Sequence, residues 1–367
     1  FYSDKHVTLS CHLTPRLSES NLSFHDLFWN HKQNMLRKRH VRISKLVRIV
    51  RIEKMNGLGE HGGLIRIVLF DRSNKTGRQI VSNVHTIRAK VSRNEWTFTD
   101  KRLKNGDGLS YGEFLVRSNY RQSRVNLLIQ VATLEKDTDG RLREKSIGMI
   151  ELPLLDESGN VLLTNKSYAD SLKEVSLFDE SPSHPISLRR IILKVRDPPR
   201  DMNHYIDSMA DILIISPLHL SPIFYFRRHC GRILIRDRQT PMCAELVNDV
   251  LLALFPPMAD DYQVLDMMSN IWSSTEKTLS NYSQEDITSQ FHQLFSSICL
   301  LLLASPLTPF QWNLSSTEIT NRQNELSILT SSISSPTAIT QFLLRNKAHP
   351  LRPHFFSFDL HSEHAID

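Results

Sequence analysis

The hydrophobic pattern changes at a pair of prolines, and this change constrains the fold more than any other feature of the sequence. From about Arg39 to Val195, short apolar stretches rich in β-branched residues alternate with glycine, asparagine and aspartate turns, which is typical of antiparallel β-structure. After Pro198 and Pro199, apolar residues recur at helical spacing. Because proline donates no backbone hydrogen bond and restricts the preceding residue, the last strand should end there. The sequence therefore predicts an α+β chain, with an N-terminal antiparallel β-sandwich followed by an all-α helical domain.

Eight strands are predicted before the prolines. They cover residues 64–70, 84–91, 96–99, 113–117, 125–133, 146–152, 160–163 and 191–195. Within 125–133, every second residue is strongly apolar, so one face of this strand should pack against a second sheet. Asp139-Gly140 and Ser158-Gly159 suit tight turns between neighbouring strands.

Helix signals follow the prolines. Thr240 and Pro241 suit the start of a helix whose apolar stripe runs over 246–254 and stops at the next proline pair. A second helix should contain residues 265–272, a central buried helix should follow a cap at Ser283, and a short helix should begin at Ser335. The predicted domains are an N-terminal extension (1–38), the sandwich (39–197), the helical domain (200–345) and a loose tail (346–367).

Length, apolar runs and cysteine content limit the kinds of protein that this chain can be. The chain of 367 residues is long enough for about two domains. It begins with Phe1, so we expect it to be part of a longer protein. Its longest apolar run, 298–304, is far shorter than the roughly 20 residues of a transmembrane helix, and no membrane span is predicted. The 4 cysteines are scattered without a C-x-x-C pair, which suggests reduced thiols rather than a disulfide framework or zinc knuckle.

A basic segment carries much of the net charge of +6. Its candidate contacts for an acidic partner or a lipid are Arg37, Lys38, Arg39, Arg42, Lys45, Arg48 and Arg51. On a helix, the last four cations would form a basic face for a membrane surface or an acidic groove. The β-branched residues between them favour a solvated edge strand, in which these cations alternate between faces. The helical alternative remains open from the sequence alone.

A second basic cluster contains Arg227, Arg228 and Arg232. These cations could meet phosphate or a carboxylate, but a solvated helix end capped by Gly231 is the simpler interpretation. The intervening His229-Cys230 pair is no metal site without two more ligands at suitable spacing.

Other candidate chemistry is weak. The segment 137–140 (DTDG) offers calcium-type oxygen ligands, but it lacks the remaining ligands of an EF-hand and is interpreted as a hairpin turn. The sequence contains no G-x-S-x-G, Walker loop, H-E-x-x-H or G-x-G-x-x-G motif. No enzyme activity, catalytic residue, cofactor or metal site is predicted.

A series of short strings resembles the nephrocystin-1 family in order and spacing. The strings lie at residues 13–17 (LTPRL), 24–29, 82–85 (SNVH), 114–120 (FLVRSNY), 231–238, 254–256 (LFP), 272 and 309–312 (PFQW). The resemblance covers about residues 10–315. It implies the C-terminal part of such a protein, with a C2-like β module, and a coiled coil and SH3 domain missing from these residues.

The resemblance implies an adaptor that organises complexes at the ciliary transition zone and cell-cell junctions, in the cytoplasm. Its partners would be nephrocystin-4-like and other transition-zone or junction proteins, and the family supplies no catalytic residues. The alternative is a C2-like module that binds phosphoinositides or anionic membranes peripherally. A basic surface alone does not distinguish acidic proteins, lipids and nucleic acid, but neither hypothesis includes nucleic acid.

Overall fold

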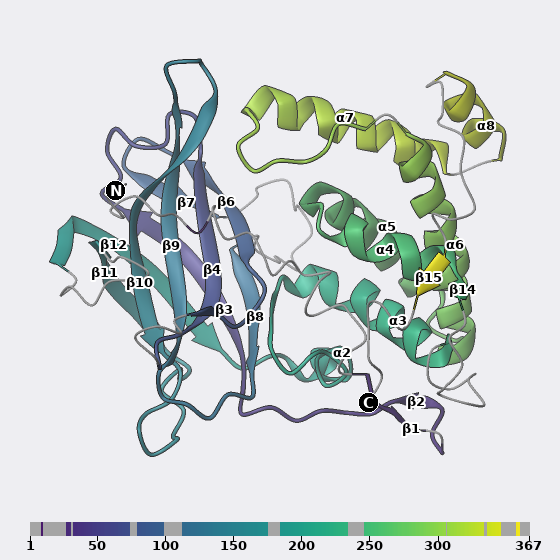
Figure 1. Cartoon of the computed structure of the whole chain (residues 1–367), viewed down its shortest axis with the longest axis horizontal. Helices are drawn as coiled ribbons and strands as arrows, with labels where there is room; N and C mark the ends of the chain where they lie inside the picture. Colours follow the sequence, from purple (N-terminus) through teal and green to yellow (C-terminus); the bar gives the residue numbers. More distant parts are fainter. Residues whose placement is uncertain are drawn as a thin grey trace.

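The computed structural model describes residues 9, 27–30, 32–73, 79–98, 112–174, 184–233, 246–305, 307–333, 336–345 and 357–359. A strand-rich body and a group of helices lie side by side (Figure 1). The chain is therefore α+β, as its hydrophobic periods predict.

Eight strands form a closed circuit. They are β3 (Ile43–Glu53), β4 (Gly63–Asp71), β6 (His85–Val91), β7 (Glu95–Thr97), β9 (Val125–Lys136), β10 (Leu142–Pro153), β11 (Ser167–Glu174) and β12 (His184–Arg196). Their order is β12-β11-β10-β9-β4-β6-β7-β3, and β3 pairs again with β12. The predicted C2-like sandwich is therefore wrong, because this sheet closes on itself as a barrel instead of packing against a second sheet.

Strand β3 closes the barrel, so the prediction that it is an edge strand is also wrong. Ile52 lies opposite Ile191 of β12 on one side and opposite Trp96 of β7 on the other.

Three further strands extend the sheet: β8 (Glu113–Ser118) pairs with β3, β13 (Leu213–Ile215) with β8, and β5 (Gln79–Ile80) with β4. Register shifts interrupt the β9–β10, β11–β12 and β12–β3 pairings, and such bulges bend strands and increase their twist.

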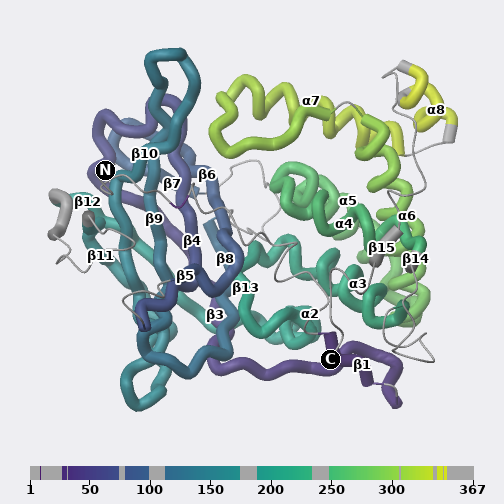
Figure 2. The backbone as a smooth tube through the Cα atoms, viewed as in Figure 1, coloured from purple at the N-terminus to yellow at the C-terminus, as the bar shows by residue number. Residues whose placement is uncertain are grey.

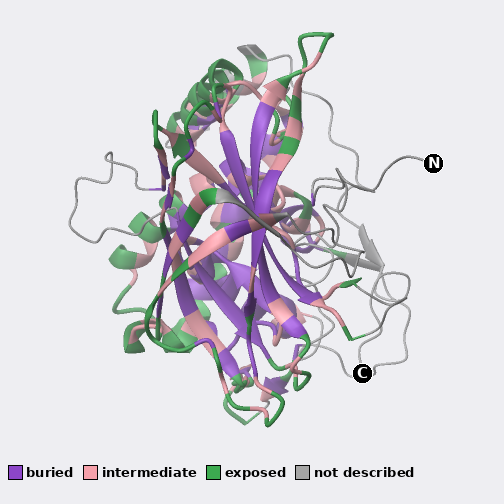
Figure 3. Cartoon of the chain, turned by 90° about the vertical axis from the view of Figure 1, so that its left-hand side faces the viewer, coloured by how far each residue is buried: buried purple, intermediate pink, exposed green. Residues whose placement is uncertain are grey.

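The alternation in β9 follows the prediction. Val125, Leu127, Ile129 and Val131 belong to the buried cluster of the barrel, whereas Leu128 belongs to a separate small cluster on the other face. Buried residues follow the barrel strands in Figure 3. The inward face therefore packs against other strands of the same closed sheet.

Turns and short pairings refine the predicted strands. The segment 137–140 is a hairpin turn as expected, in which the Gly140 backbone N–H donates to the Asp137 carbonyl at 2.9 Å. Residues 160–163 form no strand, and Val161 makes only an isolated bridge with Leu155. Strand β11, which the sequence analysis missed, lies between β10 and β12.

The helical part follows β12, which ends at Arg196. It contains η4 (Arg200–Met202), α2 (Asn203–Ile206), η5 (Pro217–His219), α3 (Leu220–Gly231), α4 (Val250–Ala259), α5 (Tyr262–Thr278), α6 (Gln284–Ala304), α7 (Ser316–Ser332) and α8 (Pro336–Arg345). The predicted cap of α6 is confirmed, because the Ser283 hydroxyl accepts from the Asp286 backbone N–H at 3.2 Å.

The predicted helix over 246–254 differs most from the structure. Residues 246–248 form β14 and pair with β15 (Ser357–Asp359), so part of the segment expected to be loose forms a strand. Helix α4 begins only after Asp249, whose side chain caps it. Pro256 and Pro257 lie inside α4 instead of ending it, although the helix extends only two residues further. The expected start at residues 240–241 lies outside the described residues.

Helix α6 lies in the core of the helical part. Its Phe291 and Phe295 are fully buried, and Trp272 of α5 meets Phe291 edge to face with ring centroids 4.9 Å apart. Among the described helices, α6 is the one long and apolar enough by composition to cross a membrane, with half of its most apolar 18-residue window buried inside the protein. Here it packs as a core helix.

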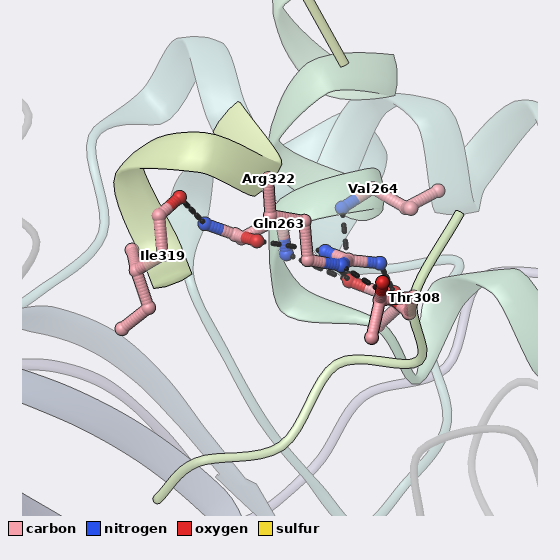
Figure 4. A network of polar contacts seen from close by, with 6 residues as sticks. Gln263, Val264, Thr308, Ile319 and Arg322 are labelled. Atoms are coloured by element: carbon pink, nitrogen blue, oxygen red, sulfur yellow. Dashed lines mark hydrogen bonds and ion pairs between the residues drawn. The ribbon is translucent and has the colours of Figure 1, made fainter. Parts of the chain in front are cut away.

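A buried network of hydrogen bonds and an ion pair connects helix α7 to the start of α5 (Figure 4). Arg322 donates to the Gln263 side chain at 2.7 Å and to the Thr308 carbonyl at 2.8 Å, and it pairs with the Asp261 carboxylate. Gln263 in turn donates to the Ile319 carbonyl at 3.3 Å. These bonds satisfy the guanidinium of Arg322, a residue that is only 3% exposed.

The barrel and the helices share a core. Leu46 of β3 and Leu115 of β8 belong to the same buried cluster as the helix residues. Strand β13, which joins the sheet from within the helical part of the chain, is held by Asn83, whose side chain exchanges two hydrogen bonds with the Ile214 backbone at 2.8 and 3.0 Å. Arg117 of β8 donates to the Ala210 carbonyl at 3.0 Å. Apolar packing and buried polar contacts therefore join the two parts.

Candidate functional site

Three cations of the basic segment, Lys45, Arg48 and Arg51, lie within strand β3. Residues 43–53 are strand, so the alternative of a basic helical face is wrong. Within β3, Lys45 pairs with Asp197 at 2.6 Å and Arg51 pairs with Glu53 at 2.8 Å. Arg48 is partly buried. Lys45 and Arg51 are therefore already paired with carboxylates of the same chain, although the Arg51 side chain is 42% exposed.

Residues 37–42 hold the exposed part of the basic segment. Arg39 is anchored, because it pairs with Asp211 at 2.6 Å and lies 4.8 Å from the centre of the Phe28 ring. Arg37, Lys38 and Arg42 are exposed, and no carboxylate among the described residues pairs with them. We name these three the basic surface. They are the predicted contact residues that remain most accessible to a partner.

The second basic cluster is largely buried, which corrects the prediction of a solvated helix end. Arg227 and Arg228 are 1% and 6% exposed. Arg227 donates to the Ser208 carbonyl at 3.1 Å, and Arg228 donates to the Thr288 hydroxyl at 3.0 Å. Arg232 stays partly exposed and donates to the Ser289 hydroxyl at 3.3 Å. Arg227 and Arg228 therefore hold α3 against its neighbours.

A hairpin from the N-terminal segment covers this end of α3. It is formed by β1 (Trp29–Asn30) and β2 (Met35–Leu36), and it lies beside the helices in Figure 2. A Cβ at Gly231 would lie 2.7 Å from the Trp29 ring and 3.1 Å from Leu36. Gly231 is thus needed for close approach of the hairpin. It is not a left-handed cap, since Arg232 after it keeps helical dihedral angles.

The helices bring together three side chains that the sequence analysis did not connect. His229 near the end of α3, Asp249 before α4 and His292 in α6 converge on one oxygen. Asp249 Oδ2 lies 3.0 Å from His229 Nε2 and 3.3 Å from His292 Nε2. The two imidazole rings stack with centroids 4.3 Å apart. No local sequence signal links these positions, which lie 20 and 43 residues apart along the chain.

Burial and hydrogen bonding set the charges of this cluster. Burial lowers the pKa of His229 and thus favours its neutral imidazole. Burial alone would raise the pKa of Asp249, but hydrogen bonds from both imidazoles hold it well below its ordinary value. The cluster therefore presents a carboxylate to two ring nitrogens.

A groove of about 720 Å³ lies where the β9–β10 hairpin meets the start of α7. Its walls carry both signs of charge, because Lys136 and Arg141 line it together with Glu60 and Glu318. Ser315 and Glu318 form a capping box, in which the Ser315 backbone N–H donates to Glu318 at 2.7 Å. The start of α7 is thus already satisfied within the chain.

Comparison with known proteins identifies relatives along the whole chain. No protein-family model matches it. A nephrocystin-1-like protein from Caenorhabditis elegans is 35% identical over 366 residues, which is 100% of this chain and 52% of the relative. Nephrocystin-1 from Canis lupus familiaris is 25% identical over 339 residues, covering 83% of this chain and 58% of the relative. The chain thus spans little more than half the length of these relatives. In agreement with the motifs along its sequence, the chain is a relative of the nephrocystin-1 family.

Proposed function

We propose that this chain is a non-enzymatic scaffold that organises protein complexes at the ciliary transition zone and at cell-cell junctions. The observation that carries the proposal is the 35% identity to a nephrocystin-1-like protein over 366 residues. The proposed partners are nephrocystin-4-like and other transition-zone or junction proteins, in the cytoplasm at the ciliary base.

The way the two parts are joined supports this role. A scaffold must hold its docking surfaces in a fixed relation, and a shared apolar core resists relative motion better than a small polar contact. Leu46 and Leu115 extend the helical core onto the barrel. Arg88 of β6 adds a hydrogen bond to the Leu314 carbonyl at 2.9 Å, beside the start of α7.

The basic surface is the proposed contact for an acidic partner. Arg37, Lys38 and Arg42 are exposed close to Arg39, which is held by Asp211. An anchored backbone lowers the entropy cost of presenting neighbouring side chains to a partner. Complementary charge would mainly accelerate association and set specificity.

A binding experiment tests the proposal. Purified chain is used to capture a nephrocystin-4-like protein, and the affinity is compared with that of the variant Arg37→Glu/Lys38→Glu/Arg42→Glu. Binding should fall at least about tenfold, because like charges placed across an interface cost several kcal/mol.

The control variant changes the net charge equally at other exposed cations, as Lys90→Glu/Arg93→Glu/Arg121→Glu. It should bind like the unmodified chain. Failure of the unmodified chain to bind the nephrocystin-4-like protein would contradict the proposed partner. Equal binding by both triple variants would instead contradict the role of the basic surface.

A peripheral contact with anionic membranes is the second candidate function. It is favoured by Phe28, which is 45% exposed and whose carbonyl accepts from the Arg37 backbone N–H at 2.7 Å. An exposed ring beside cations suits the interface of an anionic bilayer. Pelleting with phosphatidylserine vesicles should fall steeply with salt and be lost in the Arg37/Lys38/Arg42 variant; equal pelleting with neutral vesicles would contradict this function.

A further inference from the structure

The cluster of His229, Asp249 and His292 combines ligand types with a built geometry. Its residues come from three helical elements whose mutual packing is fixed by aromatic contacts. Phe226 of α3 stacks on Phe255 of α4 with centroids 4.5 Å apart, and Phe255 meets Phe291 of α6 at 6.1 Å. Side chains one to six residues from these rings are therefore held in a defined arrangement.

Two of the three separations between the donor atoms are close to those around a tetrahedral metal ion. The three donor atoms lie within 4.8 Å of one another. Two of their separations are 3.0 and 3.3 Å. Bonds of about 2.0–2.1 Å from zinc to nitrogen and oxygen place neighbouring tetrahedral ligands about 3.3–3.4 Å apart. An ion would require shifts of a few tenths of an ångström on these two edges, and rotation of the two stacked imidazole rings so that both Nε2 lone pairs point to it.

Asp249 is oriented for this purpose by a bond on its other oxygen. Oδ1 accepts from the Leu252 backbone N–H at 2.9 Å as the cap of α4, which leaves Oδ2 directed toward the imidazoles. Hydrogen bonds to the non-coordinating atoms of ligands commonly fix their orientation at metal sites. The His292 side chain is 36% exposed, so the cluster has a route for an ion and for a water molecule.

We propose that His229 Nε2, His292 Nε2 and Asp249 Oδ2 bind one divalent transition-metal ion of the zinc class, with solvent in the fourth position and the proton of each neutral imidazole carried on Nδ1. The ion would connect the end of α3, the start of α4 and the third turn of α6. Two imidazoles and one carboxylate are donors that zinc accepts. The buried His229 Nδ1 has no hydrogen-bond partner among the described residues, so the site lacks one supporting contact and should be weaker than a fully supported zinc site.

Two conservative variants test the site. Asp249→Asn keeps an acceptor for the cap of α4 but removes the charged ligand. His292→Gln changes a partly exposed residue and should leave the fold intact. His40→Gln is the matched control, because His40 is exposed and lies in the basic segment.

The full chain, without a histidine tag, is stripped with a chelator and titrated with Zn²⁺ against a chromophoric competitor. Unmodified chain and His40→Gln should bind one equivalent, and Co²⁺ should give the intense visible bands of a tetrahedral site. Both cluster variants should bind at least about tenfold more weakly, since even supporting contacts at metal sites contribute about 10–100-fold.

Circular dichroism of the metal-free variants checks that each is folded. Absence of stoichiometric binding by the unmodified chain would overturn the proposal, as would equal affinity in a folded His292→Gln variant. Either result would leave the cluster as a hydrogen-bonded cap alone. The outcome is independent of the proposed scaffold function, which is tested by partner capture.

Discussion

A methyl group at Gly63 tests how tightly the barrel packs around Trp96. The Cβ of Gly63→Ala would lie 2.3, 2.5 and 2.6 Å from three atoms of the Trp96 ring. Carbon atoms normally approach to about 3.5 Å, so the ring or the strand must retreat by about 1 Å. Trp96 is fully buried and has little room to move. Overpacking of this kind costs about 1–3 kcal/mol, and we expect Gly63→Ala to lower the free energy of unfolding by about 3 kcal/mol.

The assay is urea unfolding followed by far-ultraviolet circular dichroism. Gly140→Ala is the control: Gly140 has a φ of +75° but nothing within 4 Å of an added Cβ, so only backbone strain acts, at about 1 kcal/mol. A double-mutant cycle isolates the clash. In a Trp96→Leu background, Gly63→Ala should cost less than about 1 kcal/mol, because the smaller side chain leaves space. An equal cost of Gly63→Ala in both backgrounds would refute the reasoning.

Three further perturbations follow from buried contacts. Arg322→Met should lower the free energy of unfolding by about 3 kcal/mol, because it leaves the Asp261 carboxylate without its buried partner. Adding Asp261→Asn to this variant should recover part of the lost free energy, measured by the same urea unfolding. Burial raises the pKa of the Cys230 and Cys299 thiols, so iodoacetamide should modify these two cysteines only after denaturation, as followed by peptide mass spectrometry. Gly231→Ala should displace the β1–β2 hairpin and increase amide hydrogen exchange across it.

Each of these predictions has a contradicting outcome. Modification of Cys230 or Cys299 in the native chain at the rate of an unfolded chain would show that their surroundings open readily. Unchanged exchange in the hairpin of Gly231→Ala would show that the hairpin does not pack closely on α3. A double variant at Arg322 and Asp261 no more stable than Arg322→Met would exclude the stranded carboxylate as the cause of the loss.

The sequence correctly predicted structural elements whose formation depends on residues close together in the chain. The alternation in 125–133 predicted both the strand and its inward face, because side chains in a strand point alternately to opposite faces. The cap at Ser283 predicted the start of α6, because its hydroxyl satisfies a backbone donor three residues away. The turn at 137–140 likewise needed only its own residues.

For the candidate sites, the sequence located the basic segment but could not show which cations are accessible. Lys45 is paired with Asp197, a residue 152 positions away, and no local pattern could indicate this partner. The same limit applies to His229, whose neighbours Asp249 and His292 are brought to it only by the packing of α3, α4 and α6.

By itself, the sequence determined the change from strands to helices, the turns and several helix ends, because each depends on interactions within a few residues. Tertiary structure alone decided that β3 closes a barrel by pairing with both β12 and β7. It also decided that residues 246–248 pair with 357–359 as strands instead of starting a helix. Those outcomes depend on contacts between distant segments, whose free energy outweighs local preference and leaves no trace in the local pattern.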